Sequence, residues 1–125
     1  MITVPAIRQS CAGIDVGKRE LAVAIAVGPV DKEAAIETRM FGTTVPALQQ
    51  LRCWLEEHQC SSVAIESTGS YWIPVKNLLE GALEIVLVCS RKHHPKKGEK
   101  TDYRDAIGLA HYHRHGLLTG SYLPE

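Results

Sequence analysis

The chain has 125 residues, of which 45% are hydrophobic and 22% are charged, which is the size and composition of one globular domain. The apolar content excludes intrinsic disorder, and the balance of 14 basic against 14 acidic residues excludes a polyanion-binding protein held by overall charge. Any contact with nucleic acid must therefore come from local clusters of charge.

Several features predict a protein that is neither membrane-bound nor secreted. The apolar run Leu21–Val30 has 10 residues, whereas a membrane-spanning helix needs about 20. The first residues show no basic leader followed by an apolar stretch, so we predict no signal peptide. The cysteines form no CxxC pair, which is typical of reduced, buried or half-buried thiols; they are Cys11, Cys53, Cys60 and Cys89. We expect a cytoplasmic protein of a bacterium or an archaeon.

Three apolar runs near the start of the chain predict strands. The first, Ala12–Val16, ends at Gly17-Lys18, and the second, Leu21–Val27, ends at the turn residues Gly28-Pro29. Polar and apolar residues then alternate over Ala34–Phe41, which predicts a third strand. Three strands in close succession favour an antiparallel meander.

The apolar pattern then changes to the period of a helix. Leu48, Leu51 and Leu55 recur at helical spacing, and Thr43-Thr44 offers an N-cap before them. The run Ser62–Glu66 that follows is short and rich in branched residues, so we predict a fourth strand.

A second helix and a fifth strand follow a polar turn. Pro74 suits the first turn of that helix, and Glu84–Cys89 is a strand-like apolar run. After a polar loop over 90–101, we predict a last helix over Asp102–His115 that Gly116 ends. The order βββαβαβα predicts an α/β protein with a mixed five-stranded sheet flanked by helices, as in the ribonuclease H-like fold.

Acidic residues occupy unusual places in this arrangement. Asp15 lies inside an apolar strand, and Glu66 ends the fourth strand, which would lie beside the first and parallel to it. Asp102 and Asp105 are three residues apart at the start of the last helix and share one face of it. The topology would bring all four carboxylates to one edge of the sheet.

Four carboxylates in one place suit one or two Mg²⁺ (or Mn²⁺) ions, because hard oxygen ligands are those that Mg²⁺ prefers. Paired metals of this kind hold the attacking and leaving oxygens of a phosphodiester, which indicates a nuclease or strand-transferase site. The alternative is that these carboxylates bind no metal. Asp102 and Asp105 would then interact favourably with the helix dipole, and Glu66 would be a solvated residue at the end of a strand.

Four segments resemble the N-terminal domain of the DEDD insertion-sequence transposases of the Piv/MooV class, which are described as bridge-RNA-guided recombinases. They are GIDVGKRELAVAI (13–25), IESTGSYWIPVKNLLE (65–80), EIVLVCSRKHH (84–94) and KTDYRDAIGLAHYHRHGLL (100–118). The KTDxxDA and ExTGxYW elements are the specific ones. The resemblance implies a RuvC-like fold in which catalytic carboxylates bind Mg²⁺ for DNA cleavage and strand transfer; they are Asp15, Glu66, Asp102 and Asp105.

The resemblance also divides the chain and implies partners. Residues 1–10 form an N-terminal tail, 11–116 the RuvC-like DEDD catalytic domain, and 117–125 the start of a linker to a C-terminal domain that carries a serine nucleophile. The implied partners are DNA, a guide (bridge) RNA and further copies of the chain in a dimer or tetramer. Family members usually have serine where this chain has Gly17, and we expect that change to be tolerated.

A basic segment follows the fifth strand. Residues 91–100 contain five of the 14 basic residues, and such a cluster beside a metal site favours contacts with a phosphate backbone. The candidate nucleic-acid contacts are Arg91, Lys92, Lys96, Lys97, Lys100, Lys18 and Tyr71. The alternative for the segment is a solvated loop, and for the neighbouring Trp72 we expect packing on the sheet. The histidines of the last helix lack a third zinc ligand, so we interpret them as surface or hydrogen-bonded residues.

Four functions remain open at this stage. The leading hypothesis is the catalytic domain of a DNA transposase or recombinase, in which water or a serine from another domain attacks the phosphate. The alternatives are a stand-alone Holliday-junction-resolvase-like or RNase H-like nuclease, an actin-like sugar kinase or ATPase, and a non-catalytic nucleic-acid-binding module. The kinase hypothesis depends on the phosphate-loop character of Gly13–Gly17, and no second DxGGT-like loop supports it.

Overall fold

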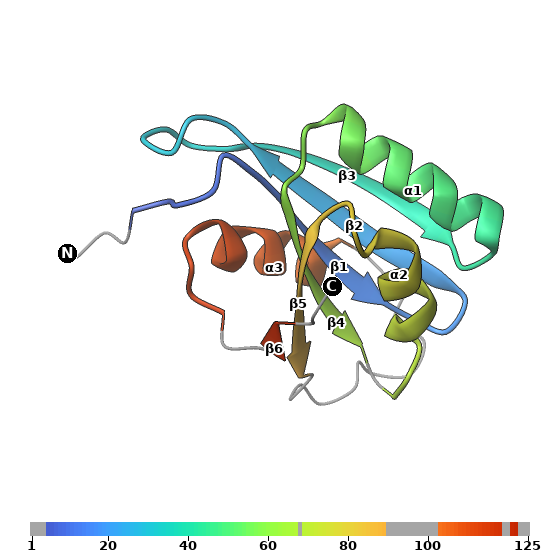
Figure 1. The fold of residues 1–125 in the computed structure, drawn as a ribbon. Coiled ribbons are helices and arrows are strands. Elements are labelled where there is room, and N and C mark those ends of the chain that lie inside the picture. The colour runs from blue at the N-terminus through green and yellow to red at the C-terminus, as the bar shows by residue number, and fades with distance from the viewer. Residues whose placement is uncertain (1–4, 68, 90–102, 119–120, 123–125) are drawn as a thin grey trace.

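The computed structural model describes residues 5–67, 69–89, 103–118 and 121–122. Within these residues the chain forms a mixed sheet with the strand order β3-β2-β1-β4-β5-β6 and three helices (Figure 1). The elements in chain order are β1 (Ser10–Val16), β2 (Glu20–Val27), β3 (Ala35–Gly42), α1 (Val45–Glu57), β4 (Ser62–Ser67), α2 (Trp72–Leu79), β5 (Glu84–Cys89), α3 (Arg104–Arg114) and β6 (Ser121–Tyr122).

The order βββαβαβα predicted from the sequence is confirmed. Strands β1, β2 and β3 pair as an antiparallel meander, and β4 and β5 extend the sheet parallel to β1. The two-residue strand β6 pairs antiparallel with β5 and was not predicted, because two residues are too few to show a periodic pattern. It falls in the range that the sequence analysis assigns to the start of a linker.

Predicted caps set the ends of two helices. The hydroxyl of Thr44 accepts a hydrogen bond from the backbone N–H of Ala47 at 3.3 Å, which satisfies one free donor in the first turn of α1. Gly116 has a φ of +70°, a left-handed conformation that ends α3 as expected. None of the helices in the described ranges has the length and apolar character needed to cross a membrane.

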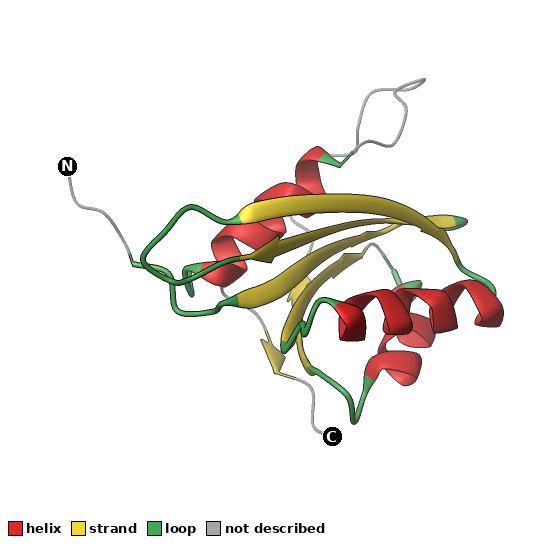
Figure 2. Cartoon of the chain, turned by 90° about the horizontal axis from the view of Figure 1, so that it is seen from above, coloured by secondary structure: helices red, strands yellow, loops and turns green. Residues whose placement is uncertain are grey.

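The helices cover the two faces of the sheet unequally. Helices α1 and α2 lie on one face and α3 on the other, as the view along the sheet shows (Figure 2). The α1/α2 face carries the larger core, with branched side chains such as Ile14 and Val23 from the strands and Leu51 and Leu55 from α1. Trp72 packs partly buried against this core, as the sequence predicts.

Small residues line the opposite face of the sheet. Alternate residues along a strand point to opposite faces, and in β2 the sequence alternates large and small side chains. The small set packs against Ala106 and Ala110 of α3, and its strand members are Cys11, Ala22, Ala24 and Ala26. Because few atoms stand between them, α3 lies directly on β1 and β2.

Candidate metal centre

The pairing of β1 with β4 places two carboxylates side by side. Asp15 and Glu66 are partners in the parallel register, and each is the last residue but one of its strand. Asp15 follows Cys11 and Gly13 by even steps, so it belongs to the face on which α3 packs. Asp15 is half-buried and Glu66 is buried, with 7% of its surface exposed.

Helix α3 supplies the third carboxylate. Asp105 lies in the first turn of α3 and is exposed, and the helix runs across β1 and its neighbours. Ligand oxygens of Asp15, Glu66 and Asp105 all lie within 4.8 Å of one another. The fourth residue of the predicted set, Asp102, lies outside the described residues.

The chemistry and spacing of the three carboxylates fit a hard divalent cation. Carboxylate oxygens suit Mg²⁺, Mn²⁺ or Ca²⁺, whereas zinc and copper sites in proteins are built mainly on imidazole and thiolate ligands. Oxygens on one octahedral Mg²⁺ lie about 3 to 4.2 Å apart, so a spacing within 4.8 Å is close to what one ion or a pair of ions requires. A cation would also offset the repulsion among three neighbouring negative charges. The residues therefore fit the predicted metal.

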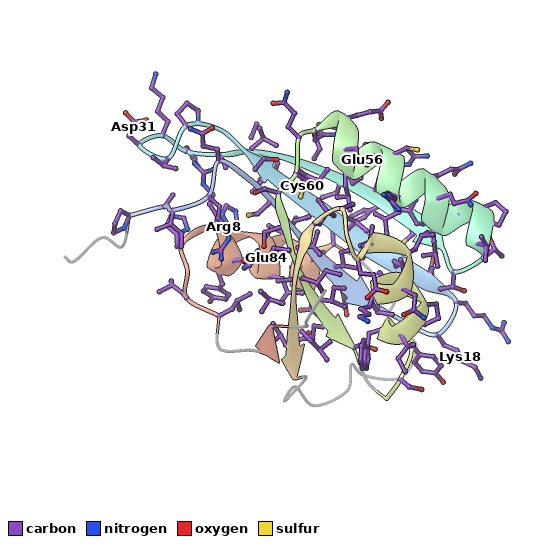
Figure 3. All side chains as sticks on the ribbon, in the orientation of Figure 1. Arg8, Lys18, Asp31, Glu56, Cys60 and Glu84 are labelled. Atoms are coloured by element: carbon purple, nitrogen blue, oxygen red, sulfur yellow. The ribbon has the colours of Figure 1, made fainter. Side chains whose placement is uncertain are left out.

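Two of the predicted nucleic-acid contacts lie at the same end of the sheet. Lys18 follows β1 three residues after Asp15, and Tyr71 precedes α2 five residues after Glu66; both are exposed. The opposite end of the molecule carries the β2–β3 turn with Asp31 (Figure 3). The remaining candidates lie outside the described residues; they are Arg91, Lys92, Lys96, Lys97 and Lys100.

A buried arginine, which was not predicted from the sequence, holds the last turn of α3. Arg114 is 1% exposed and lies in the last turn of the helix. It donates hydrogen bonds to backbone carbonyl oxygens of the N-terminal segment and the β2–β3 turn; they belong to Arg8 (2.9 Å), Gln9 (3.4 Å), Gly28 (3.1 Å), Pro29 (2.7 Å) and Lys32 (2.9 Å). A signal for it existed in the sequence: a basic residue in the last helical turn, where free carbonyl groups attract cations.

A second polar group beside Arg114 also fixes this end of the helix. Ser62 donates its hydroxyl proton to Glu84 at 2.6 Å, and its oxygen lies 2.6 Å from Nε2 of His113. Since Ser62 has only one proton to donate, Nε2 of His113 must be the donor to it. Burial lowers the pKa of His113 to about 4. This is not a Ser–His–acid nucleophile, because the imidazole cannot accept the serine proton.

Together, Arg114 and His113 form what we call the α3 anchor. The hydrogen bonds of Arg8 to the carbonyl of His113 and to Glu84 complete it. The anchor lies at the end of the sheet where β4 and β5 begin, whereas Glu66 lies near the end of β4. It confirms that the histidine at 113 is a hydrogen-bonded residue.

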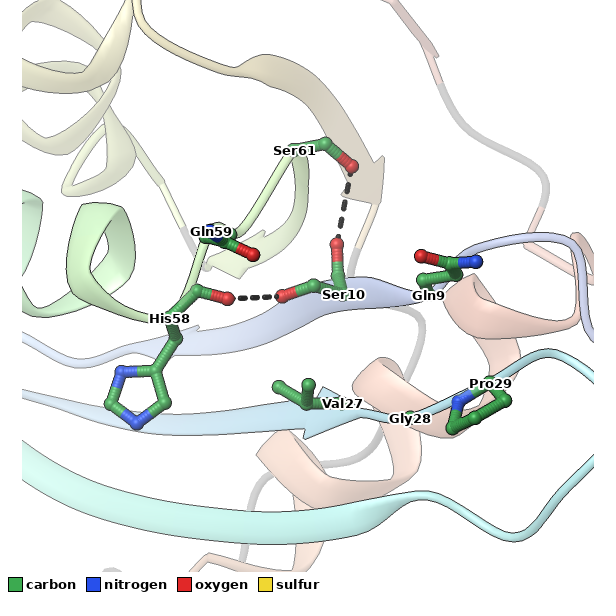
Figure 4. Close-up of a pocket in the computed structure, with 8 residues that line it drawn as sticks. All are labelled: Gln9, Ser10, Val27, Gly28, Pro29, His58, Gln59 and Ser61. Carbon is green, nitrogen blue, oxygen red and sulfur yellow. Dashed lines mark hydrogen bonds between the residues drawn. The ribbon is translucent and has the colours of Figure 1, made fainter.

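An open pocket of about 450 Å³ lies at that same distant end (Figure 4). Its lining comes from the start of β1, the end of β2 and the α1–β4 connection, and includes Ser10, His58 and Ser61. Ser10 and Ser61 use their hydroxyls on backbone carbonyls within the protein, at 2.9 Å and 3.2 Å. None of the predicted site residues within the described ranges lines this pocket.

The fold and the carboxylate cluster define the class: a ribonuclease H-like domain with an acidic site at the carboxyl end of its central parallel strands. Within that class, the chain belongs to the transposase family DEDD_Tnp_IS110, whose family model matches residues 12–125. This confirms the resemblance found in the sequence and the recombinase-type function, and it leaves the actin-like kinase hypothesis without support.

Similarity to a solved structure agrees with the fold. The chain is similar to RuvC of Thermus thermophilus, with a TM-score of 0.59 and 13% sequence identity over 91% of this chain and 99% of that chain. A weaker likeness, with a TM-score of 0.49 and 15% identity, is to the Fowlpox virus resolvase solved with Holliday junction DNA, over 70% of this chain and 65% of that one. No curated protein matches the sequence.

Proposed function

We propose that this domain is the metal-dependent catalytic domain of a DNA transposase, and that it binds Mg²⁺ or Mn²⁺ through Asp15, Glu66, Asp102 and Asp105. The observation that carries the proposal is the meeting of three carboxylates, from two strands and a helix, within 4.8 Å. Family membership supports DNA as the substrate and strand cleavage and transfer as the reaction.

Two kinds of element hold the carboxylates in this proposal. Asp15 and Glu66 belong to adjacent paired strands, so the sheet holds them as a rigid pair. Asp105 approaches from the helix above, and its exposure leaves the site open to a bound phosphodiester. When bound, the metal would polarise the scissile phosphate and stabilise the charge that develops there.

Residues outside the cluster would hold the DNA. Lys18 is an exposed cation near Asp15, and the basic residues of 91–100 follow β5, the strand next to β4. Tyr71 offers an exposed ring for stacking on a base or sugar. The proposed catalytic domain over 11–116 also takes in Ser10, which begins β1, and β6, which pairs with β5. A following C-terminal domain that carries a serine is proposed on family membership. A guide RNA and a dimer or tetramer are proposed on family membership alone.

Metal binding tests the site directly. We expect Mn²⁺, titrated against the chain by calorimetry, to bind to the wild type and to lose at least tenfold in affinity in Asp15→Asn and in Asp105→Asn. Asp31→Asn is the matched control, because Asp31 is exposed at the opposite end of the molecule (Figure 3). Wild-type protein that does not bind Mn²⁺ would contradict the proposed function.

A cleavage assay separates the proposed function from its alternatives. The full-length transposase is incubated with Mg²⁺ and either its insertion-sequence DNA or a four-way junction. Strand transfer that Asp15→Asn abolishes supports a transposase, whereas junction cleavage without transfer indicates a resolvase-like nuclease. DNA binding with neither reaction indicates a non-catalytic module.

A further inference from the structure

We propose that Gly13 is a positioning residue for the metal centre: its missing side chain sets how closely α3 approaches β1, and therefore whether Asp105 reaches Asp15 and Glu66. This inference depends on the proposed function, because it concerns the same cluster. It assigns a role to a residue that makes no contact with the metal.

The packing at Gly13 leaves no room for a side chain. A Cβ atom there would lie 2.6 Å from the backbone nitrogen of Ala110 and 2.6 Å from Cβ of Leu109, and closer still to the carbonyl oxygen of Ala106. Ordinary contacts of a Cβ atom begin at 3.4 Å. A glycine inside a strand often marks such a close approach of another backbone. Any side chain at this position would push α3 outward by about 1 Å.

The contact point lies next to the metal site on both elements. Gly13 is two residues before Asp15 on the same face of β1, and Ala106 directly follows Asp105 in α3. Asp15 and Glu66 are held together by the β1–β4 pairing whatever the helix does. Asp105 belongs to the helix and not to the sheet, so it reaches the other two carboxylates only while α3 lies against Gly13.

The α3 anchor determines which end of the helix moves. Arg114 and His113 fix the last turn through hydrogen bonds to five carbonyl groups and to Ser62. An outward push at 106–110 therefore cannot be relieved at the anchored end. The first turn, which carries Asp105, must move away from the sheet.

The variant Gly13→Ala tests this geometry with Mn²⁺ as the probe. We expect it to lower the affinity for Mn²⁺ by at least tenfold relative to the wild type, which is typical of a metal ligand whose supporting residue is removed. The matched control is Gly108→Ala, because it adds the same methyl group to α3 at a position with nothing within 4 Å. Circular dichroism and urea unfolding without metal establish that each variant is folded.

A rescue experiment distinguishes positioning from a merely structural role. Glutamate at position 105 is longer by one methylene and would span the gap left by the displaced helix. We expect Asp105→Glu to weaken Mn²⁺ binding in the wild-type background and to restore at least part of it in Gly13→Ala. A general loss of stability would not be repaired by lengthening one ligand, so failure of the rescue overturns the inference.

A second variant applies if Gly13→Ala does not fold. Ala24 is the β2 partner of Gly13 and packs in the same small-residue layer under α3, so Ala24→Val pushes the helix from the neighbouring strand. We expect the same loss of Mn²⁺ affinity and the same rescue by Asp105→Glu. A folded variant that binds Mn²⁺ like the wild type overturns the inference, while loss of binding in Asp15→Asn leaves the proposed function standing.

Discussion

At the scale of single residues, position in the sheet decides the chemistry of otherwise ordinary side chains. Asp15 and Glu66 are carboxylates at the ends of adjacent parallel strands, and the register makes them partners. The sequence predicts that these two carboxylates are neighbours. A charge inside an apolar strand needs a compensating partner, and the order of strands and helices predicts that β4 lies beside β1. The structure brings three of the four predicted carboxylates together, and their role in metal binding stays a prediction.

Other residues could not be placed from the sequence. Gly13 looks like any small residue of an apolar strand until α3 is seen lying on it, because the contact joins elements that are far apart in the chain.

The cysteines differ in how well their burial is predicted. Cys53 is predicted to be buried or half-buried but is exposed, since the stripe that α1 buries consists of Leu48, Leu51, Trp54 and Leu55. Cys11 and Cys60 are buried as expected, and burial raises the pKa of their thiols to about 11 and about 12.

His113 is expected to make the free energy of unfolding depend on pH under acidic conditions. Its native pKa of about 4 lies below the unfolded value of 6.5, so the unfolded chain binds more protons between these values. Stability is therefore lost as the pH falls from about 6.5 toward 4, by at most about 1.4 kcal/mol per pH unit. We expect urea unfolding of His113→Gln between pH 7 and 5 to show a flatter dependence than the wild type.

His58 provides the control for that experiment. Its hydrogen bond to the Trp54 carbonyl and the nearby Glu37 carboxylate raise its pKa, so its contribution is present below pH 6.5 and lost as the pH rises. His58→Gln should therefore change the pH dependence above about 6.5 and with the opposite sign. Equal slopes for His113→Gln and the wild type between pH 6.5 and 5 would contradict the assignment of a neutral buried imidazole.

At the scale of elements, short-range sequence signals were sufficient for the first five strands and for the capped helix ends. Alternation, turn residues and caps located β1 to β5 and the start of α1 within one or two residues. They did not reveal how α3 is held, because the α3 anchor joins its last turn to the N-terminal segment and the β2–β3 turn. Hydrogen bonds across such separations leave no periodic pattern in the sequence.

Arg114 is expected to be the main support of α3. Replacing it with methionine removes the donor to five carbonyl groups, so we expect a loss of about 3–5 kcal/mol in the free energy of unfolding, measured with urea. Arg114→Lys should recover only part of this loss, because an ammonium group cannot reproduce the planar fork of a guanidinium. A loss below about 1 kcal/mol in Arg114→Met would show that the buried hydrogen bonds contribute little.

At the scale of the whole molecule, the two ends of the sheet carry different kinds of residues. One end carries the polar network and the turn that hold the chain together, and the other carries the carboxylates with Lys18 and Tyr71 beside them. The balanced net charge means that long-range attraction to DNA is weak. We therefore predict that DNA binding depends on the local basic cluster over 91–100.

This arrangement predicts a specific salt dependence for DNA binding. Replacing Lys96, Lys97 and Lys100 with glutamine should weaken binding to duplex DNA and reduce the slope of log K against log[salt] by about 0.9 for each phosphate that is no longer neutralised. Fluorescence anisotropy of labelled DNA at several salt concentrations measures that slope. The control with the same net charge replaces Lys32, Arg52 and Lys76, which lie on the β2–β3 turn and on α1 and α2. Both triple variants carry the same net charge. A slope that falls only in the variant of Lys96, Lys97 and Lys100 therefore locates the DNA-binding cations in the basic segment. Equal slopes for the two triple variants would show that this segment is not part of the DNA-binding surface.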